Sequence, residues 1–144
     1  DTIFTEEYKF EIGKGTVLTE GDDVSIIACG IMVNEAIKAS EELKKEGINA
    51  RVINMSTIKP IDKELIIKSA KETKAIVTAE EHSIIGGLGS AVSEVLAEEC
   101  PTILKRVGIK DVFGESGNPN DLLEKYGLTY KDIISSVKEV IAKN

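Results

Sequence analysis

The feature that most constrains this chain is its alternation of short apolar runs with longer amphipathic stretches. Runs rich in Ile, Val and Ala occupy 24–29, 51–55, 75–79 and 103–107. The stretches between them repeat apolar residues every three or four positions, as helices with one buried face do. This alternation predicts an α/β fold, a three-layer α/β/α sandwich with a mainly parallel sheet of about five strands. The second run is expected to be buried except at its polar first residue, Arg51.

Local signals place several boundaries. Asp62 is the expected N-cap of the second helix, and Thr129 with Asp132 resembles a capping box at the start of the last helix. A short helix is expected over residues 118–127. Residues 16–18 are a candidate edge strand whose direction the sequence does not give.

Composition and charge exclude several classes of protein. The formal net charge is −7, from 25 acidic and 18 basic residues. Nucleic-acid binding needs a basic surface, so we expect no nucleic-acid partner. No apolar run approaches the length of a membrane span, and we expect no membrane contact. Cys29 and Cys100 form no CxxC pair, which favours reduced cysteines in a cytoplasmic protein, without a disulfide or a metal site.

The length of 144 residues fits one globular domain. Residues 1–12 read as a connecting segment, so the domain is placed at 13–144. The chain begins with Asp1 rather than Met, and our hypothesis is that it is a piece of a longer polypeptide.

A glycine-rich segment, Gly86-Gly87-Leu88-Gly89, lies between a strand and a helix. Backbone N–H groups at a helix start would suit an anion, which makes Gly86, Gly87 and Gly89 candidates for an anion site. The spacing is not the GxGxxG of dinucleotide-binding folds. The simpler interpretation is that the glycines let the helix begin close to the sheet.

The segment Glu80-Glu81-His82 is expected just past the end of a strand, the edge where open α/β sheets bind ligands. His82 is the only histidine of the chain. A histidine beside carboxylates can do acid–base work, so Glu81 and His82 are weak catalytic candidates. No nucleophile stands nearby in sequence, and a hydrogen-bonded or interfacial histidine is the competing interpretation. The residues alone give no complete active site.

Four segments together resemble one enzyme family. Residues 22–30 (DDVSIIACG) resemble the opening of the transketolase C-terminal domain. Residues 51–62 (RVINMSTIKPID) and 80–95 (EEHSIIGGLGSAVSEV) are similar to landmarks of its superfamily, which includes deoxyxylulose-phosphate synthases and 2-oxoacid dehydrogenase β subunits. Residues 113–129 (FGESGNPNDLLEKYGLT) resemble the transketolase ending and are less typical of the other two branches.

The resemblance implies an enzyme that moves a two-carbon ketol unit from a ketose phosphate to an aldose phosphate. In that family thiamine diphosphate carries the chemistry, and an N-terminal and a middle domain hold it with Mg²⁺. The C-terminal domain packs on the middle domain and helps dimerisation. We therefore expect residues 13–144 to be that domain, to bind no cofactor and to be inactive alone. The implied partners are the N-terminal and middle domains or subunit, in a homodimer of the complete enzyme.

Details of the sequence agree with this division of labour. Gly21-Asp22-Asp23, with Asn49 downstream, lacks the second glycine of the thiamine-diphosphate signature GDG and stands in a turn before a strand. The GGLG segment resembles that of split transketolases, whose C-terminal subunit contains only middle and C-terminal domains. On position and resemblance together, Glu81, His82 and the three glycines are expected at an inter-domain or inter-subunit surface.

Three other interpretations stay open. The chain could be the C-terminal domain of a 2-oxoacid dehydrogenase β subunit, against which the FGES ending argues, or of a deoxyxylulose-phosphate synthase. It could also be a stand-alone anion-binding or assembly module that uses the glycine-rich helix start.

Overall fold

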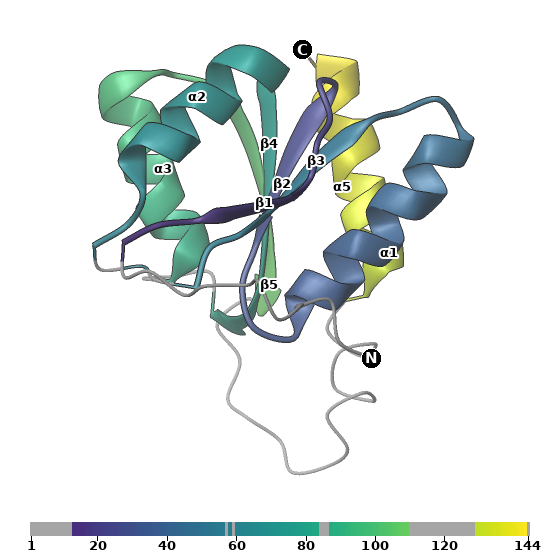
Figure 1. The fold of residues 1–144 in the computed structure, drawn as a ribbon, viewed down its shortest axis with the longest axis horizontal. Coiled ribbons are helices and arrows are strands. Elements are labelled where there is room, and N and C mark those ends of the chain that lie inside the picture. The colour runs from purple at the N-terminus through teal and green to yellow at the C-terminus, as the bar shows by residue number, and fades with distance from the viewer. Residues whose placement is uncertain (1–12, 57, 59, 84–86, 110–128, 144) are drawn as a thin grey trace, which may run out of the picture.

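The computed structural model describes residues 13–56, 58, 60–83, 87–109 and 129–143, with the backbone alone for 82, 83 and 109. The helix expected over 118–127 lies outside them. Within them a five-stranded sheet carries helices on both faces (Figure 1). The elements are β1 (Thr16–Thr19), β2 (Val24–Ala28), α1 (Met32–Lys45), β3 (Ala50–Asn54), α2 (Lys63–Thr73), β4 (Ala75–Ser83), α3 (Leu88–Glu99), β5 (Ile103–Ile109) and α5 (Tyr130–Lys143). No helix in this described part of the chain has the length and apolar character of a membrane span.

The strand order defines the topology. Neighbours run β1-β3-β2-β4-β5, and every adjacent pair is parallel except β1 with β3. The predicted α/β fold with a mainly parallel five-stranded sheet is confirmed, and the candidate edge strand at 16–18 is antiparallel. β3 and β4 lie on opposite sides of β2, so the chain moves across the sheet in one direction after β2 and in the other direction after β3. The switch point of the topology therefore lies between β2 and β4.

The two faces of the sheet bury separate hydrophobic cores. Side chains alternate along each strand, so Ile26 and Ala28 of β2 join the core under α1 and α5, while Ile27 joins the core under α2 and α3. Burial on both faces explains why the strand sequences are continuously apolar instead of alternating with polar residues.

β4 is longer than its sequence pattern predicts. It runs to Ser83, where pairing with β5 resumes after an irregularity that follows Ala79. Glu80, Glu81 and His82 therefore lie within the strand, and our prediction that they follow its end is wrong. Two consecutive glutamates are poor strand formers, so the local pattern stops short, and the contacts of Glu80 and Glu81 described below stabilise the extension.

The predicted cap at Asp62 is confirmed, and of the capping box predicted at Thr129 the half made by Asp132 is present. One oxygen of Asp62 accepts from the N–H of Leu65 at 3.1 Å, and the other accepts from the N–H of Gly15 at 2.9 Å. The Asp132 carboxylate accepts from the N–H and the hydroxyl of Thr129, both at 2.9 Å. Asp62 therefore also fastens the start of β1 to α2.

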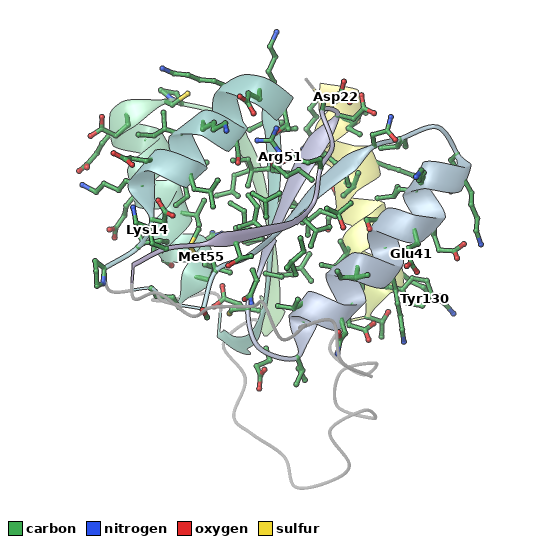
Figure 2. All side chains as sticks on the ribbon, viewed as in Figure 1. Lys14, Asp22, Glu41, Arg51, Met55 and Tyr130 are labelled. Atoms are coloured by element: carbon green, nitrogen blue, oxygen red, sulfur yellow. The ribbon has the colours of Figure 1, made fainter. Side chains whose placement is uncertain are left out.

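Arg51 is buried, contrary to its expected exposure. Its exposed fraction is 7%, and its side chain extends from β3 toward α2 (Figure 2). The guanidinium donates to the Ser69 hydroxyl at 3.2 Å and to Glu72 at 2.6 Å. Its Nε lies 3.4 Å from the Glu20 carboxylate, an ion pair without hydrogen-bond geometry. Polar partners on α2 thus let β3 hold a buried cation beside its first residue, Ala50.

We predict that Arg51→Ala lowers the free energy of unfolding by about 2 kcal/mol, because it removes buried packing and the donor to Ser69. Glu20→Gln is the control, since that side chain is 78% exposed, and it should cost under about 0.5 kcal/mol. Urea denaturation measures both. Equal costs would contradict the assignment of the stabilisation to the buried contacts.

Candidate functional site

The carboxyl ends of β2 and β4 are the place where open α/β sheets usually bind ligands. Helix α1 follows β2 on one face and α3 follows β4 on the other, so two helix N-termini begin beside the same strand pair. Free N–H groups at such helix starts attract anions. We call the residues gathered here the switch-point cluster: Cys29, Gly30, Glu80, Glu81 and Gly89.

Glu80 occupies the α3 side of this cluster. Its side chain is 0% exposed, and its two oxygens accept from the N–H groups of Leu88 and Gly89, each at 2.7 Å. These short bonds to a carboxylate are charge-assisted, and the helix dipole adds to the attraction. The Glu80 carboxylate therefore stands where an external anion would bind this helix.

Glu81 serves the α1 side in the same way. Its Oε1 accepts from the N–H of Ile31 at 3.1 Å. Gly30 has a φ of 62°, and a Cβ at that position would collide with the same oxygen, so the turn requires glycine. Successive strand residues point to opposite faces. Two adjacent glutamates can thus hold two helices that lie on opposite sides of the sheet.

Gly89 has a packing role in the glycine-rich segment. A Cβ there would lie 2.7 Å from Arg106 Cδ and 3.0 Å from Thr78 Oγ1. The glycine lets α3 begin close to the sheet, which supports the simpler of our two interpretations. The N–H of Gly89 is engaged by Glu80, while Gly87 is the N-cap of α3 with extended backbone. Gly86 lies outside the described residues.

Cys29 adjoins both glutamates at the end of β2. The pKa of its thiol is raised to about 11, first by burial and then by the negative charges of Glu80 and Glu81. The thiol is therefore protonated at neutral pH. A nucleophilic cysteine needs a lowered pKa and an electropositive environment, so Cys29 is poorly suited to act as a nucleophile.

The structure describes the two catalytic candidates, Glu81 and His82, to different extents. Glu81 is engaged with the start of α1, which is a structural contact. His82 lies in β4 with only its backbone described, so a role for it stays a prediction. Sequence reasoning missed the anchoring function of Glu80. The available signal was a pair of acidic residues at the end of a central strand, beside two helix starts.

The described residues do not fit a thiamine-diphosphate or metal site. Both helix N-termini at the switch point already bind glutamates. Within the described part of the chain, no three His, Cys, Asp or Glu side chains gather as metal ligands would. The segment Gly21-Asp22-Asp23, which lacks the complete thiamine-diphosphate signature, has a structural role. The Asp23 carboxylate accepts from the N–H of Asn49 at 2.7 Å, and so joins two turns at the edge of the sheet where β2 and β3 begin.

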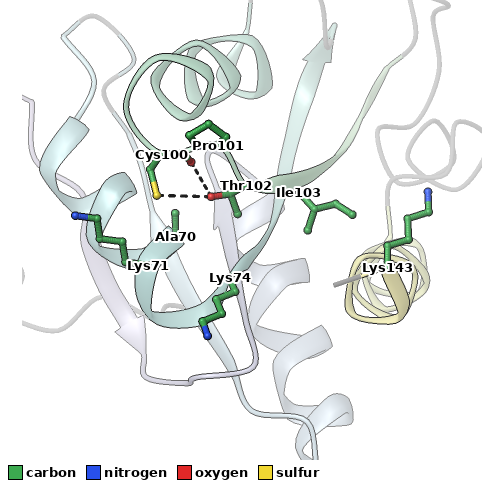
Figure 3. A pocket seen from close by; sticks show the side chains of 8 residues that line it. All are labelled: Ala70, Lys71, Lys74, Cys100, Pro101, Thr102, Ile103 and Lys143. Atoms are coloured by element: carbon green, nitrogen blue, oxygen red, sulfur yellow. Dashed lines mark hydrogen bonds between the residues drawn. The ribbon is translucent and has the colours of Figure 1, made fainter.

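A hollow of about 460 Å³ lies at that other edge, and its lining includes Lys71, Lys74, Lys143, Cys100 and Thr102. Three lysines would suit an anion, but Figure 3 shows their side chains pointing apart. Helices α2, α3 and α5 all end here. Lysines near helix C-termini offset the negative end of the dipole, so we assign these lysines to the helix ends.

Comparisons with known proteins point to one family. Residues 13–133 match the family described as transketolase, C-terminal domain. The chain is 52% identical over 138 residues to the 6-deoxy-6-sulfo-D-fructose transketolase subunit SqwH of Clostridium sp. (strain MSTE9), covering 96% of this chain and 43% of that protein. It is 45% identical over 140 residues to 1-deoxy-D-xylulose-5-phosphate synthase of Heliobacterium modesticaldum, covering 96% and 22%.

A solved structure extends the comparison to three dimensions. It is a split gene transketolase in an inactive beta4 tetramer, with a TM-score of 0.94 and 54% identity, covering 99% of this chain and 46% of that one. The chain therefore spans less than half the length of the relatives it matches.

We predict that Glu80→Ala lowers the free energy of unfolding by about 3 kcal/mol, because two buried N–H groups lose a charged acceptor. Glu81→Ala should cost about 1 kcal/mol, since it has one described bond and is only half-buried. Chemical denaturation monitored by circular dichroism compares the two. A larger loss at Glu81 than at Glu80 would contradict the assigned anchoring roles.

Alkylation of Cys29 tests the electrostatics of the cluster. With a thiol pKa of about 11, the rate should rise about tenfold per pH unit from pH 8 to 10. Glu80→Gln should lower this pKa without restoring the ordinary value of 9.0, because burial is the larger cause. Peptide mass spectrometry separates Cys29 from Cys100. A folded protein in which the Cys29 rate levels off near pH 9 would refute the assignment.

Proposed function

The chain belongs to the transketolase C-terminal domain family, and on that basis we propose that it is the C-terminal domain of a split transketolase subunit. The complete enzyme transfers a two-carbon ketol unit from a ketose phosphate to an aldose phosphate. Thiamine diphosphate, held with Mg²⁺ by domains outside this chain, supplies the electron sink for that reaction. This domain contributes packing and dimerisation and is inactive by itself.

The observation that carries this proposal is that glutamates of the same chain occupy both helix N-termini at the switch point. At α3 the N–H groups of Leu88 and Gly89 are bonded to Glu80, and at α1 the N–H of Ile31 is bonded to Glu81, while those of Met32 and Val33 are bonded to backbone carbonyls. A carboxylate from the same chain outcompetes an external anion because it needs no loss of translational freedom to bind. The same closure argues against a stand-alone anion-binding module. The domain is therefore better suited to supporting an active site than to forming one.

The proposed partners are the N-terminal and middle domains, or the subunit that carries them, in a homodimer of the complete enzyme. The relatives named above include transketolase subunits, and this chain covers less than half of them. Of the residues expected at such a surface, Gly89 is buried within the domain, and we propose that Glu81, His82, Gly86 and Gly87 face those partners. In this assignment His82 is an interface residue, not a catalytic one.

A deoxyxylulose-phosphate synthase is the second candidate, because one relative at 45% identity carries that name. Its domain arrangement would give this chain the same supporting role but a different complete enzyme. The two candidates are distinguished by the product that the restored enzyme makes.

We predict that the chain alone shows no ketol transfer with thiamine diphosphate and Mg²⁺, and that activity appears when the missing domains or subunit are restored. A coupled assay with a ketose phosphate donor and an aldose phosphate acceptor measures this. The matched control is the restored enzyme without thiamine diphosphate, which should be inactive.

The outcomes separate the proposals. Activity of the chain alone would refute a supporting role. A restored enzyme that consumes pyruvate and glyceraldehyde phosphate, and transfers no ketol unit, would instead assign the second candidate.

A further inference from the structure

We propose that residues 13–19 form a strap that releases from the edge of the sheet as a unit, and that the Asp62 carboxylate is its latch. The strap consists of Gly13-Lys14-Gly15 and strand β1. It lies at one edge of the sheet, where its strand neighbour is β3 (Figure 1). Its release would leave both hydrophobic cores and the described helices in place.

Little of the strap is buried. All four residues of β1 are half-buried, whereas every residue of β2 and β3 is buried. Its two apolar side chains, Val17 and Leu18, lie against opposite cores, and each core is built from buried residues of other elements. Release therefore uncovers little apolar surface, and its hydrophobic cost is small.

The pairing of β1 with β3 is short and irregular. Thr16 and Val17 pair in regular register, but two steps along β1, from Val17 to Thr19, then match one step along β3. A bulge of this kind leaves a residue unpaired and interrupts the ladder of main-chain hydrogen bonds. An edge strand with few buried contacts and an interrupted ladder is the kind of element that opens before the rest of a domain unfolds.

A buried carboxylate holds the N-terminal end of the strap. Asp62 has an exposed fraction of 8%, and its Oδ2 accepts from the N–H of Gly15 at 2.9 Å. A hydrogen bond to a charged acceptor is stronger than one between neutral groups. Gly15 is also packed closely, because a Cβ there would lie 2.8 Å from Leu65 Cδ2 and 3.1 Å from Met55 Cε. The latch thus combines one charged hydrogen bond with a close approach that glycine permits.

The other oxygen of Asp62 allows the latch to open without loss of the helix that it caps. Its Oδ1 accepts from the N–H of Leu65 at 3.1 Å. When the strap leaves, water can replace the Gly15 N–H at Oδ2 while Oδ1 still caps α2. The strap therefore has two arrangements, held and released, and α2 keeps its N-cap in both.

The strap ends at Glu20, where the chain can pivot. The Glu20 side chain is 78% exposed, and its ion pair with Arg51, at 3.4 Å, adds little to the attachment. The residues that follow are held firmly. A Cβ on Gly21 would collide with the backbone of Ala50, and the N–H of Asp23 donates to a carbonyl in the turn before β3 at 2.9 Å. Release thus stops at Glu20 and does not spread into β2.

Release of the strap would change the reach of the chain in a longer polypeptide. Seven extended residues span about 23 Å, and a released strap adds that length to the connection between this domain and any polypeptide before residue 13. This consequence rests on the proposed function, in which further domains precede this one. The release itself does not depend on it.

Native-state hydrogen exchange on the complete natural polypeptide tests the proposal. We expect amides of residues 15–19 to exchange at least about a hundredfold faster than those of β2. In Asp62→Asn the amide oxygen can still cap α2, but the NH₂ group cannot accept from Gly15. This variant should speed exchange at 15–19 by at least about a further fivefold and leave residues 63–73 unchanged.

Two further variants separate the latch from the cap. Gly15→Ala leaves Asp62 intact but places a methyl group against Leu65, so it should also speed exchange at 15–19. Asp132→Asn is the matched control, because Asp132 bonds to Thr129 at the start of α5. It should leave exchange at 15–19 unchanged.

Two results would overturn the proposal. One is exchange at 15–19 as slow as in β2, because the strap would then open only when the whole domain unfolds. The other is acceleration of 63–73 by Asp62→Asn with no effect of Gly15→Ala at 15–19, because Asp62 would then be a helix cap alone. Ketol transfer is assayed separately on the same samples. Release without activity would reject the proposed function and keep the strap, whereas activity without release would do the reverse.

Discussion

The interaction on which this structure depends is the binding of helix N-termini by carboxylates at the end of the central strand. Glu80 is fully buried, which would be unfavourable for a charged side chain without partners. Two N–H groups of α3 satisfy it, and Glu81 satisfies the start of α1 on the other face. The unpaired N–H groups at the two helix starts and the two glutamate carboxylates thus stabilise each other. The adjacent residues Glu80 and Glu81 therefore attach one helix of each layer to the sheet.

This arrangement explains how a fold suited to ligand binding can serve a supporting role. The switch point of an open α/β sheet is a common ligand site because helix starts leave donors free. Here those donors are used internally, and the neighbouring thiol of Cys29 is kept protonated by burial and by the same carboxylates. The chemistry proposed for the complete enzyme would then belong to the other domains, which we propose this edge to face.

Much of the architecture could be predicted from the sequence because the determining signals are local or periodic. Continuous apolar runs indicated strands buried on both faces, and the caps at Asp62 and Thr129 fixed two helix starts. The length of β4 could not be predicted, because glutamates in a strand are stabilised only by helices that meet it in three dimensions. Arg51 was misjudged for the same reason, since its partners Ser69 and Glu72 lie on α2.

The sequence by itself determined the fold class, the family and the lack of a recognisable cofactor signature, because periodicity and motifs are properties of neighbouring residues. Only the tertiary structure decided that β1 is antiparallel, that Glu80 and Glu81 bind opposite helices, and that Gly30 must be glycine. The contacts of the two glutamates join residues 8 to 50 positions apart along the chain. Such pairings depend on how the strands are ordered, and strand order is set by the packing of the whole domain.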